Sequence, residues 1–166
     1  MNNAQIIAII GPPSCGKTTL VNQLAKDGYQ VIEEQARKEI PKWTLPDKRL
    51  DFQKFLFLKH VELEEQVTGL VFSDTARYCS VMYADLYGFD LRTEFPDKLK
   101  YHYSKVILLH PLQFVPDGVR IETNSNDIWC RLYKTYKEFG QNVICLDKMT
   151  KTQLLEKVKM LALLKR

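Results

Sequence analysis

The residues best suited to chemistry lie between Gly11 and Thr18, in the run Gly-Pro-Pro-Ser-Cys-Gly-Lys-Thr. This run matches the pattern G-x-x-x-x-G-K-[ST] at every fixed position. Glycines at both ends let such a loop wrap so that successive backbone N–H groups point at a polyphosphate. Lys17 supplies a positive charge for the β- and γ-phosphates, and the Thr18 hydroxyl can bind Mg²⁺. The sequence therefore predicts a site for a nucleoside triphosphate, ATP or GTP.

The residues around this loop strengthen the prediction. A short apolar run over 4–10 precedes it and is typical of a buried strand, and a helical pattern follows it directly. The N-terminus of that helix would add unpaired N–H groups and the positive end of its dipole. The expected nucleotide-binding residues are Gly11, Pro12, Pro13, Ser14, Cys15, Gly16, Lys17, Thr18 and Thr19.

Acidic residues lie where two other predicted strands end. Asp74 closes the apolar run 70–73, where a carboxylate can reach the Mg²⁺ that Thr18 binds; Asp is also a good helix N-cap, and the two roles are compatible. Glu33 and Glu34 follow the strand predicted at 29–32. A carboxylate there could accept the proton of an acceptor hydroxyl as its oxygen approaches the γ-phosphorus. The alternative is a solvated glutamate in the first turn of a helix.

Basic and aromatic residues near the expected ligand end are further candidates. Arg120 follows Asp117 in the loop after the fourth predicted strand, where small kinases often carry an arginine that neutralises charge on the transferring phosphoryl group. Arg131, in the next predicted helix, is the competing candidate. Trp43 and Trp129 adjoin loops at this end and could stack on a base, although packing against a core is the commoner use of tryptophan.

The elements that must position these residues alternate along the chain. Strands are predicted over 4–10, 29–32, 70–73, 105–109 and 142–146. Helices are predicted over 17–27, 35–40, 47–69, 124–140 and 150–164, and a further helix follows Asp74 and ends at Gly88. The segment 89–103, interrupted by Pro96, fits neither pattern. Alternating strands and helices predict an α/β fold with a parallel sheet covered on both faces and its ligand at the carboxyl ends of the strands.

Length and composition limit the class of protein. A chain of 166 residues with 45% hydrophobic and 27% charged residues is typical of one soluble globular domain, and we expect a single domain over 1–166 with a lid at about 111–130. The net charge of +4 suits polyanionic substrates, but no cluster of five or more basic residues indicates a nucleic-acid track. The N-terminal apolar run is too short to span a membrane and lacks the basic leader of a signal peptide.

The four cysteines show neither a C-x-x-C pair nor zinc-ligand spacing. Cys79, Cys130 and Cys145 lie in apolar segments, where a free cysteine behaves as a small hydrophobic residue, and this usage favours the reducing cytoplasm. Cys15 lies within the nucleotide loop, where we expect it to fill space rather than to take part in redox chemistry.

Four sequence elements occur in an order typical of one group of proteins. They are the phosphate loop, E-x-x-R from Glu34 to Arg37, D-T at Asp74, and D-G-x-R ending at Arg120. From residue 4 to about 146 the chain resembles the small AAA-type P-loop kinases that include the bacterial ribosylnicotinamide (nicotinamide riboside) kinase domain. The resemblance implies a five-stranded sheet in the order 2-3-1-4-5.

The resemblance also implies roles for individual residues. Glu34 and Arg37 would face the acceptor, which favours Glu34 over Glu33 as the base. Where a second acidic residue would be expected shortly after Asp74, this chain has alanine and then Arg77. The expected catalytic residues are thus Lys17, Glu34 and Arg120, the acceptor-binding residues Glu34, Arg37, Asp74 and Arg77, and the metal ligands Thr18 and Asp74.

These features favour a kinase that uses ATP or GTP with Mg²⁺ to phosphorylate a hydroxyl or phosphate of a nucleoside-like or nucleotide acceptor. A kinase acting on a nucleic-acid end or a modified base is an alternative that the mild basicity permits. A nucleotide-binding module without turnover and an acceptor-independent ATPase or GTPase are two others. The GTPase is disfavoured because the chain has no N-K-x-D, and its one D-x-x-G, at 85–88, lies at the end of a predicted helix.

Overall fold

The centre of the molecule is a five-stranded parallel sheet in the order β2-β3-β1-β4-β5. The structure, a computed structural model, describes residues 4–43, 49–112 and 124–164. The strands are β1 (Gln5–Ile10), β2 (Gln30–Ile32), β3 (Leu70–Asp74), β4 (Lys105–Leu108) and β5 (Val143–Cys145). This order confirms the sheet that the resemblance implied, and it places the nucleotide loop, which follows β1, at the middle of the sheet.

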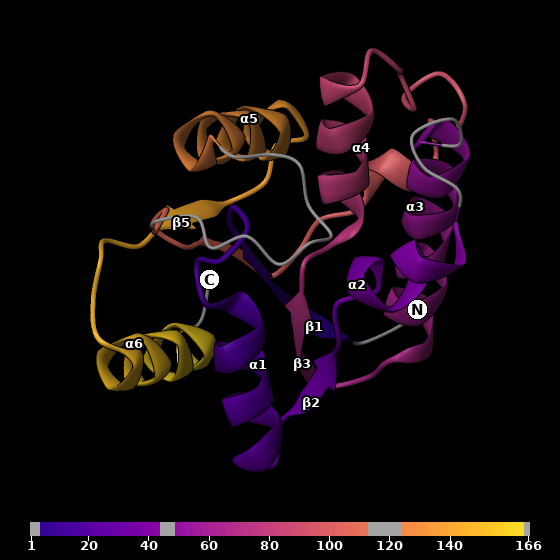
Figure 1. The fold of residues 1–166 in the computed structure, drawn as a ribbon. Coiled ribbons are helices and arrows are strands. Elements are labelled where there is room, and N and C mark those ends of the chain that lie inside the picture. The colour runs from indigo at the N-terminus through magenta and orange to yellow at the C-terminus, as the bar shows by residue number, and fades with distance from the viewer. Residues whose placement is uncertain (1–3, 44–48, 113–123, 165–166) are drawn as a thin grey trace.

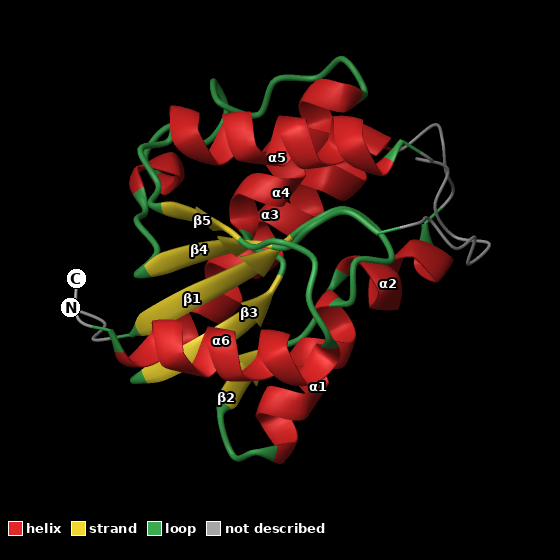
Figure 2. Ribbon diagram, turned by 90° about the vertical axis from the view of Figure 1, so that its left-hand side faces the viewer, coloured by secondary structure: helices red, strands yellow, loops and turns green. Residues whose placement is uncertain are grey.

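Helices cover both faces of the sheet (Figures 1 and 2). Helices α1 (Lys17–Lys26) and α6 (Lys151–Leu163) pack on one face, and α3 (Arg49–Gln66), α4 (Arg77–Leu86) and α5 (Ser125–Glu138) pack on the other. Because successive strand residues point to opposite faces, Ile7 and Ile9 lie in the first core while Ile6 and Ile10 lie in the second. Strand β1 is therefore buried on both sides, as its continuous apolar run predicts.

Short helical segments lie in two of the connections between these elements. The chain after β2 forms α2 (Ala36–Glu39) and then a 3-10 turn, η1 (Ile40–Lys42). The α-helix ends at Glu39, before Pro41 as predicted, but Pro41 itself lies in the first turn of η1, so the helical stretch continues two residues beyond the predicted end at Ile40. Proline is tolerated there because the first N–H groups of a helical turn have no partner within it.

The segment 89–103 contains one further 3-10 turn, η2 (Lys98–Lys100). Side chains from distant elements hold its second half in place. The Tyr78 hydroxyl lies 3.0 Å from the carbonyl oxygen of Leu99 and 2.5 Å from that of Tyr101, and Gln141 Nε2 donates to Tyr101 at 2.8 Å. These partners are 21 to 40 residues away along the chain, which explains why no local pattern predicts the segment.

The cysteines differ from expectation in one respect. Cys79 and Cys15 are buried, but Cys130 and Cys145 are exposed, although both lie in segments that the sequence shows as apolar. Cys145 lies on β5, which is an edge strand of the sheet, and Cys130 lies on the solvent side of α5. Among the described residues, no helix is both long enough and apolar enough to cross a membrane.

Candidate active site

The nucleotide loop joins the central strand β1 to helix α1. Lys17 is the first residue of α1, and its Nζ donates hydrogen bonds of 2.9 Å to the carbonyl oxygens of both Gly11 and Pro12. The side chain is 6% exposed, so its charge is directed along the loop rather than into bulk solvent. Ser14 and Gly16 have positive φ angles of 62° and 93°. Left-handed residues of this kind are typical of turns whose N–H groups form an anion-binding concavity.

The first glycine of the loop cannot carry a side chain without displacement of its neighbours. A Cβ atom at Gly11 would lie 2.7 Å from Cys15 Sγ and 3.3 Å from the Cβ of Leu109. Cys15 is 4% exposed and belongs to the core on the α1 side of the sheet. Its thiol therefore fills the space inside the loop, in keeping with the packing role expected from the sequence.

Three oxygen-bearing side chains from different elements meet next to the loop. The Thr18 hydroxyl donates to Asp74 Oδ2 at 2.7 Å and lies 3.5 Å from Glu34 Oε2. Thr18 comes from α1, Asp74 ends β3, and Glu34 follows β2. Asp74 is 1% exposed and Glu34 6% exposed. The structure thus brings together three residues that the sequence places at separate strand ends.

This group fits a magnesium site in its chemistry. Mg²⁺ prefers oxygen ligands and is usually bound through one or two carboxylates together with phosphate oxygens and water. The Thr18 hydroxyl and the Asp74 carboxylate provide ligands of this kind at the edge of the loop. Within residues 4–43, 49–112 and 124–164, no three His, Cys, Asp or Glu side chains are grouped as they would be in an all-protein metal site.

The two neighbouring glutamates have different environments. Glu34 points inward, and its Oε2 lies 3.6 Å from Arg37 Nε, with Arg37 55% exposed. Glu33 is 57% exposed and forms an ion pair with Lys38. Only Glu34 is therefore close to both Thr18 and the side chain of Arg37, as the E-x-x-R element led us to expect.

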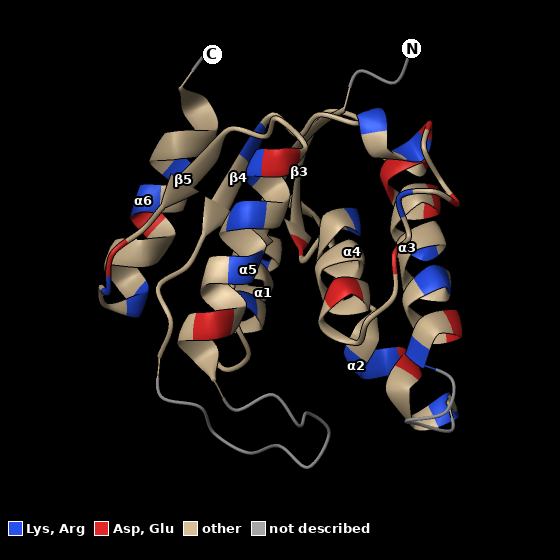
Figure 3. Ribbon diagram, turned by 90° about the horizontal axis from the view of Figure 1, so that it is seen from above, with Lys and Arg blue, Asp and Glu red and all other residues tan. Residues whose placement is uncertain are grey.

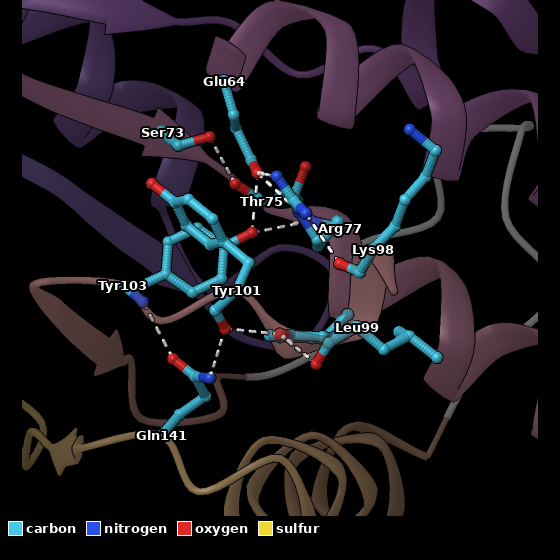
Figure 4. A network of polar contacts seen from close by, with 10 residues as sticks. Glu64, Ser73, Thr75, Arg77, Lys98, Leu99, Tyr101, Tyr103 and Gln141 are labelled. Atoms are coloured by element: carbon cyan, nitrogen blue, oxygen red, sulfur yellow. Dashed lines mark hydrogen bonds and ion pairs between the residues drawn. The ribbon is translucent and has the colours of Figure 1, made fainter. Parts of the chain in front are cut away.

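Arg77 lies in a buried polar network instead of an open site (Figure 4). Its Nε donates to Glu64 Oε2 at 2.7 Å, and its Nη1 donates to the carbonyl oxygen of Lys98 at 2.7 Å. The Tyr103 hydroxyl donates to Glu64 Oε1 at 2.7 Å and accepts the backbone N–H of Arg77 at 3.1 Å. The guanidinium also lies 4.3 Å from the centre of the Tyr101 ring. We therefore remove Arg77 from the acceptor-binding residues, because its side chain is 4% exposed and engaged on all sides.

We expect Arg77→Met to destabilise the protein by about 3–5 kcal/mol, because it leaves the Glu64 carboxylate buried without its partner. Burial alone already raises the pKa of Glu64, although Arg77 and Tyr103 oppose that effect. Denaturant unfolding measures the difference. Arg131→Met is the control, since Arg131 forms one exposed ion pair with Asp127 and should change stability by about 0.5 kcal/mol or less. Equal effects of the two substitutions would contradict the structural role of Arg77.

The remaining candidates lie outside this group. Both tryptophans pack on other aromatic side chains of the protein. The ring centres of Trp43 and Phe52 are 5.4 Å apart, and Trp129 stacks on Tyr133 with ring centres 5.9 Å apart. Stacking of either tryptophan on a base stays a prediction. Arg120 and most of the expected lid lie outside the described residues.

The sequence did not single out the three buried polar residues of α3, which are Gln53, His60 and the Glu64 described above. Gln53 is 5% exposed and His60 3% exposed, and both lie in the apolar stripe that packs this helix on the rest of the molecule. The signal was present as polar residues at a spacing of seven in a helix whose other buried positions are mostly apolar.

Comparison with known proteins supports the fold and the family. A family model described as an AAA domain matches residues 6–153. Among solved structures, NadR in complex with NAD and AMP-PNP has a TM-score of 0.76 and 22% identity, over 99% of this chain and 51% of that one. The present chain thus spans about half the length of NadR. A search of curated protein sequences found no match.

Two other structures match over nearly their whole length. Deoxyadenosine kinase from M. mycoides has a TM-score of 0.67 and 16% identity, over 93% of this chain and 96% of that one. Shikimate kinase from Acinetobacter baumannii has a TM-score of 0.58 and 18% identity, over 98% of this chain and 94% of that one. At these identities the likeness concerns the fold, which is that of the P-loop kinases. Together with the family model and the loop at residues 11–18, it shows that the chain belongs to the AAA domain family of P-loop proteins.

Proposed function

We propose that the protein is a kinase that transfers the γ-phosphoryl group of ATP, with Mg²⁺, to a nucleoside-like or nucleotide acceptor. The observation that carries the proposal is the meeting of Thr18, Asp74 and Glu34 beside the loop that holds Lys17. A hydrolase needs the loop and a metal ligand, but a second buried carboxylate with an arginine beside it suits an acceptor hydroxyl. Two of the three structural neighbours described above are named as kinases, which supports this class of activity.

The proposed reaction assigns a task to each side chain. The loop N–H groups and Lys17 bind the phosphates, and Thr18 and Asp74 would hold Mg²⁺, whose charge neutralises the β- and γ-phosphate oxygens when it is bound. Glu34 accepts the proton of the acceptor hydroxyl while the oxygen forms a bond to the γ-phosphorus. The bond from that phosphorus to the β-phosphate oxygen breaks, and ADP leaves with the electron pair. Arg37, 3.6 Å from Glu34, would orient the carboxylate or contact the acceptor.

Asp74→Asn should raise the Mg²⁺ concentration at half-maximal activity by about tenfold or more while nucleotide still binds the loop. An amide oxygen is a weaker ligand for a hard cation than a carboxylate oxygen. Titration of activity against Mg²⁺ gives the midpoint, and a nucleotide-binding measurement without metal gives the control. If the midpoint is unchanged, Asp74 only positions the Thr18 hydroxyl and caps the turn that follows β3.

One screen tests the proposed function as a whole. The protein is incubated with labelled ATP or GTP and with nucleosides, nucleotides, oligonucleotides and no acceptor, and labelled products are separated. A phosphorylated small molecule confirms the kinase, and a labelled oligonucleotide end favours the nucleic-acid alternative. Phosphate release that no acceptor changes would identify an ATPase or GTPase.

Lys and Arg are interspersed with Asp and Glu along α3 in Figure 3, an arrangement unlike the basic track of a nucleic-acid site.

A further inference from the structure

Two buried polar atoms of α3 have no hydrogen-bond partner among the residues that the structure describes. They are Oε1 of Gln53 and Nδ1 of His60. The two side chains are 5% and 3% exposed, so bulk water does not solvate them freely. Buried polar groups are nearly always hydrogen-bonded, and an unpaired one lowers the stability of a folded protein. Two of them on one helix therefore point to a ligand.

Both atoms lie on the side of α3 that faces α4. Helices α3 and α4 lie side by side (Figures 1 and 3). Arg49, one turn before Gln53, lies over the ring of Tyr87 just after α4 at 4.7 Å, and Glu64, one turn after His60, pairs with Arg77 of α4 at 2.6 Å. Gln53 and His60 come between these two contacts at helical spacing, so they share this face.

One end of this face is next to the phosphate site. His60 Nε2 lies 3.4 Å from the hydroxyl of Thr75, which directly follows Asp74. Thr75 has a positive φ of 67°, a conformation that threonine rarely adopts and that is often found at functional sites. Gln53 is two helical turns, or about 10 Å, further along α3. The face thus runs away from the reacting phosphate over roughly the length of a nucleoside.

The two unpartnered groups on this face are uncharged. Burial, assisted by the charge of Arg77, lowers the pKa of His60 to about 4, so its ring is neutral near pH 7. The carboxylate of Glu64 is already paired with Arg77. Phe57, one turn after Gln53 and one turn before His60 on α3, is also buried. A neutral amide oxygen and a neutral imidazole in apolar surroundings suit a flat, uncharged ring that carries N–H groups.

We propose that Gln53 and His60 bind the heterocycle of the acceptor, and that this heterocycle is uncharged and bears N–H donors, as in adenosine or cytidine. The proposal rests on the kinase activity proposed above and names its substrate class. A cationic pyridinium ring is disfavoured because Glu64, the carboxylate of α3 at helical spacing with Gln53 and His60, is paired with Arg77. The residue two places after Asp74, where an acidic side chain could also meet such a ring, is the buried Ala76.

The test compares five acceptors: adenosine, cytidine, nicotinamide riboside, shikimate and ribose. We measure kcat/KM for each and, independently, their binding by calorimetry in the presence of AMP-PNP and Mg²⁺. We expect adenosine or cytidine to exceed the other three by at least about tenfold in both measurements. Stronger binding of nicotinamide riboside or shikimate than of both neutral nucleosides would overturn the proposal.

Variants of Gln53 separate binding from structure. Gln53→Leu should lower the affinity for adenosine and cytidine by about 10- to 100-fold, because it removes the proposed hydrogen-bond acceptor. Tm should not fall, because the buried Gln53 Oε1 has no hydrogen-bond partner among the described residues. Gln53→Glu should shift preference towards nicotinamide riboside. Gln66→Leu, at the exposed end of the same helix, is the matched control and should change neither property. His60→Phe should also weaken nucleoside binding while the fold is kept.

The outcomes distinguish this inference from the proposed function. If no acceptor is phosphorylated but adenosine or cytidine binds and Gln53→Leu abolishes that binding, the kinase is wrong and the binding face is confirmed. If transfer occurs and Gln53→Leu lowers Tm with kcat/KM unchanged, Gln53 is structural and the inference is wrong. The inference is also wrong if Gln53→Leu and His60→Phe both lower Tm while nucleoside affinity is unchanged.

Discussion

Lys17→Ala is expected to abolish phosphoryl transfer, with a loss in kcat/KM of about 10³-fold or more. The substitution removes the ammonium group that the Gly11 and Pro12 carbonyl oxygens hold beside the loop, where it would pair with the β- and γ-phosphates. The cores are untouched, since the residues that pack α1 on the sheet are Leu20, Val21 and Leu24. Steady-state kinetics measures the loss, and a thermal melt shows whether the variant is folded.

Lys26→Ala is the matched control for this result. Lys26 belongs to the same helix but lies in its last turn and is exposed. Its removal should leave kcat within about twofold of the original protein, because it is far from the loop and surface substitutions have small effects. A folded Lys17→Ala variant that keeps a near-normal kcat would rule out the phosphate-binding role of the loop.

Glu34→Gln should lower acceptor-dependent kcat by about 10²- to 10⁴-fold, the usual contribution of a positioned general base. The amide keeps the shape of the side chain but cannot accept the hydroxyl proton. Affinity for ATP should change little, because the loop and Lys17 bind the phosphates. The lost ion pair with Arg37 does not explain such a decrease, since it is 3.6 Å long with one partner more than half exposed and contributes about 1 kcal/mol at most.

Glu33→Gln provides the comparison. This glutamate precedes Glu34 directly, yet it is exposed and bound to Lys38 on the outside of the connection. Its replacement should change kcat by less than about threefold, which corresponds to a surface effect of well under 1 kcal/mol. Equal effects of the two substitutions, or a decrease in ATP affinity with Glu34→Gln at constant kcat, would show that the base lies elsewhere.

The parts of the site that the sequence predicts are those that depend on local pattern. The loop is defined by eight consecutive residues, and Asp74 and Glu34 follow apolar runs that are recognisable as strands. In a parallel sheet the carboxyl ends of strands share one edge, so residues that follow neighbouring strands come together. The hydrogen bond of 2.7 Å between the Thr18 hydroxyl and Asp74, which are 56 residues apart, is a consequence of that geometry.

The features that the sequence did not predict depend on contacts between distant residues. Arg77 looks like a free cation next to the site until Glu64 and Tyr103, 13 and 26 residues away, are seen to enclose it. Cys145 lies in an apolar run, but its exposure depends on β5 being the edge strand. The roles of Gln53 and His60 depend equally on what α3 packs against, which a helical pattern alone does not specify.

The position of β1 in the sheet also has a consequence for biosynthesis. Ile7 of β1 is aligned with Phe72 of β3 on one side and with Lys105 of β4 on the other, so both neighbours are made long after it. During synthesis, which proceeds from the N-terminus, the most hydrophobic strand must therefore wait unpaired while some sixty and then about a hundred further residues are added. Parallel pairing between strands so far apart in the sequence forms slowly, and hydrophobic side chains and strand edges stay exposed until it is complete. The nascent strand is therefore the segment most exposed to aggregation until β3 and β4 have been synthesised.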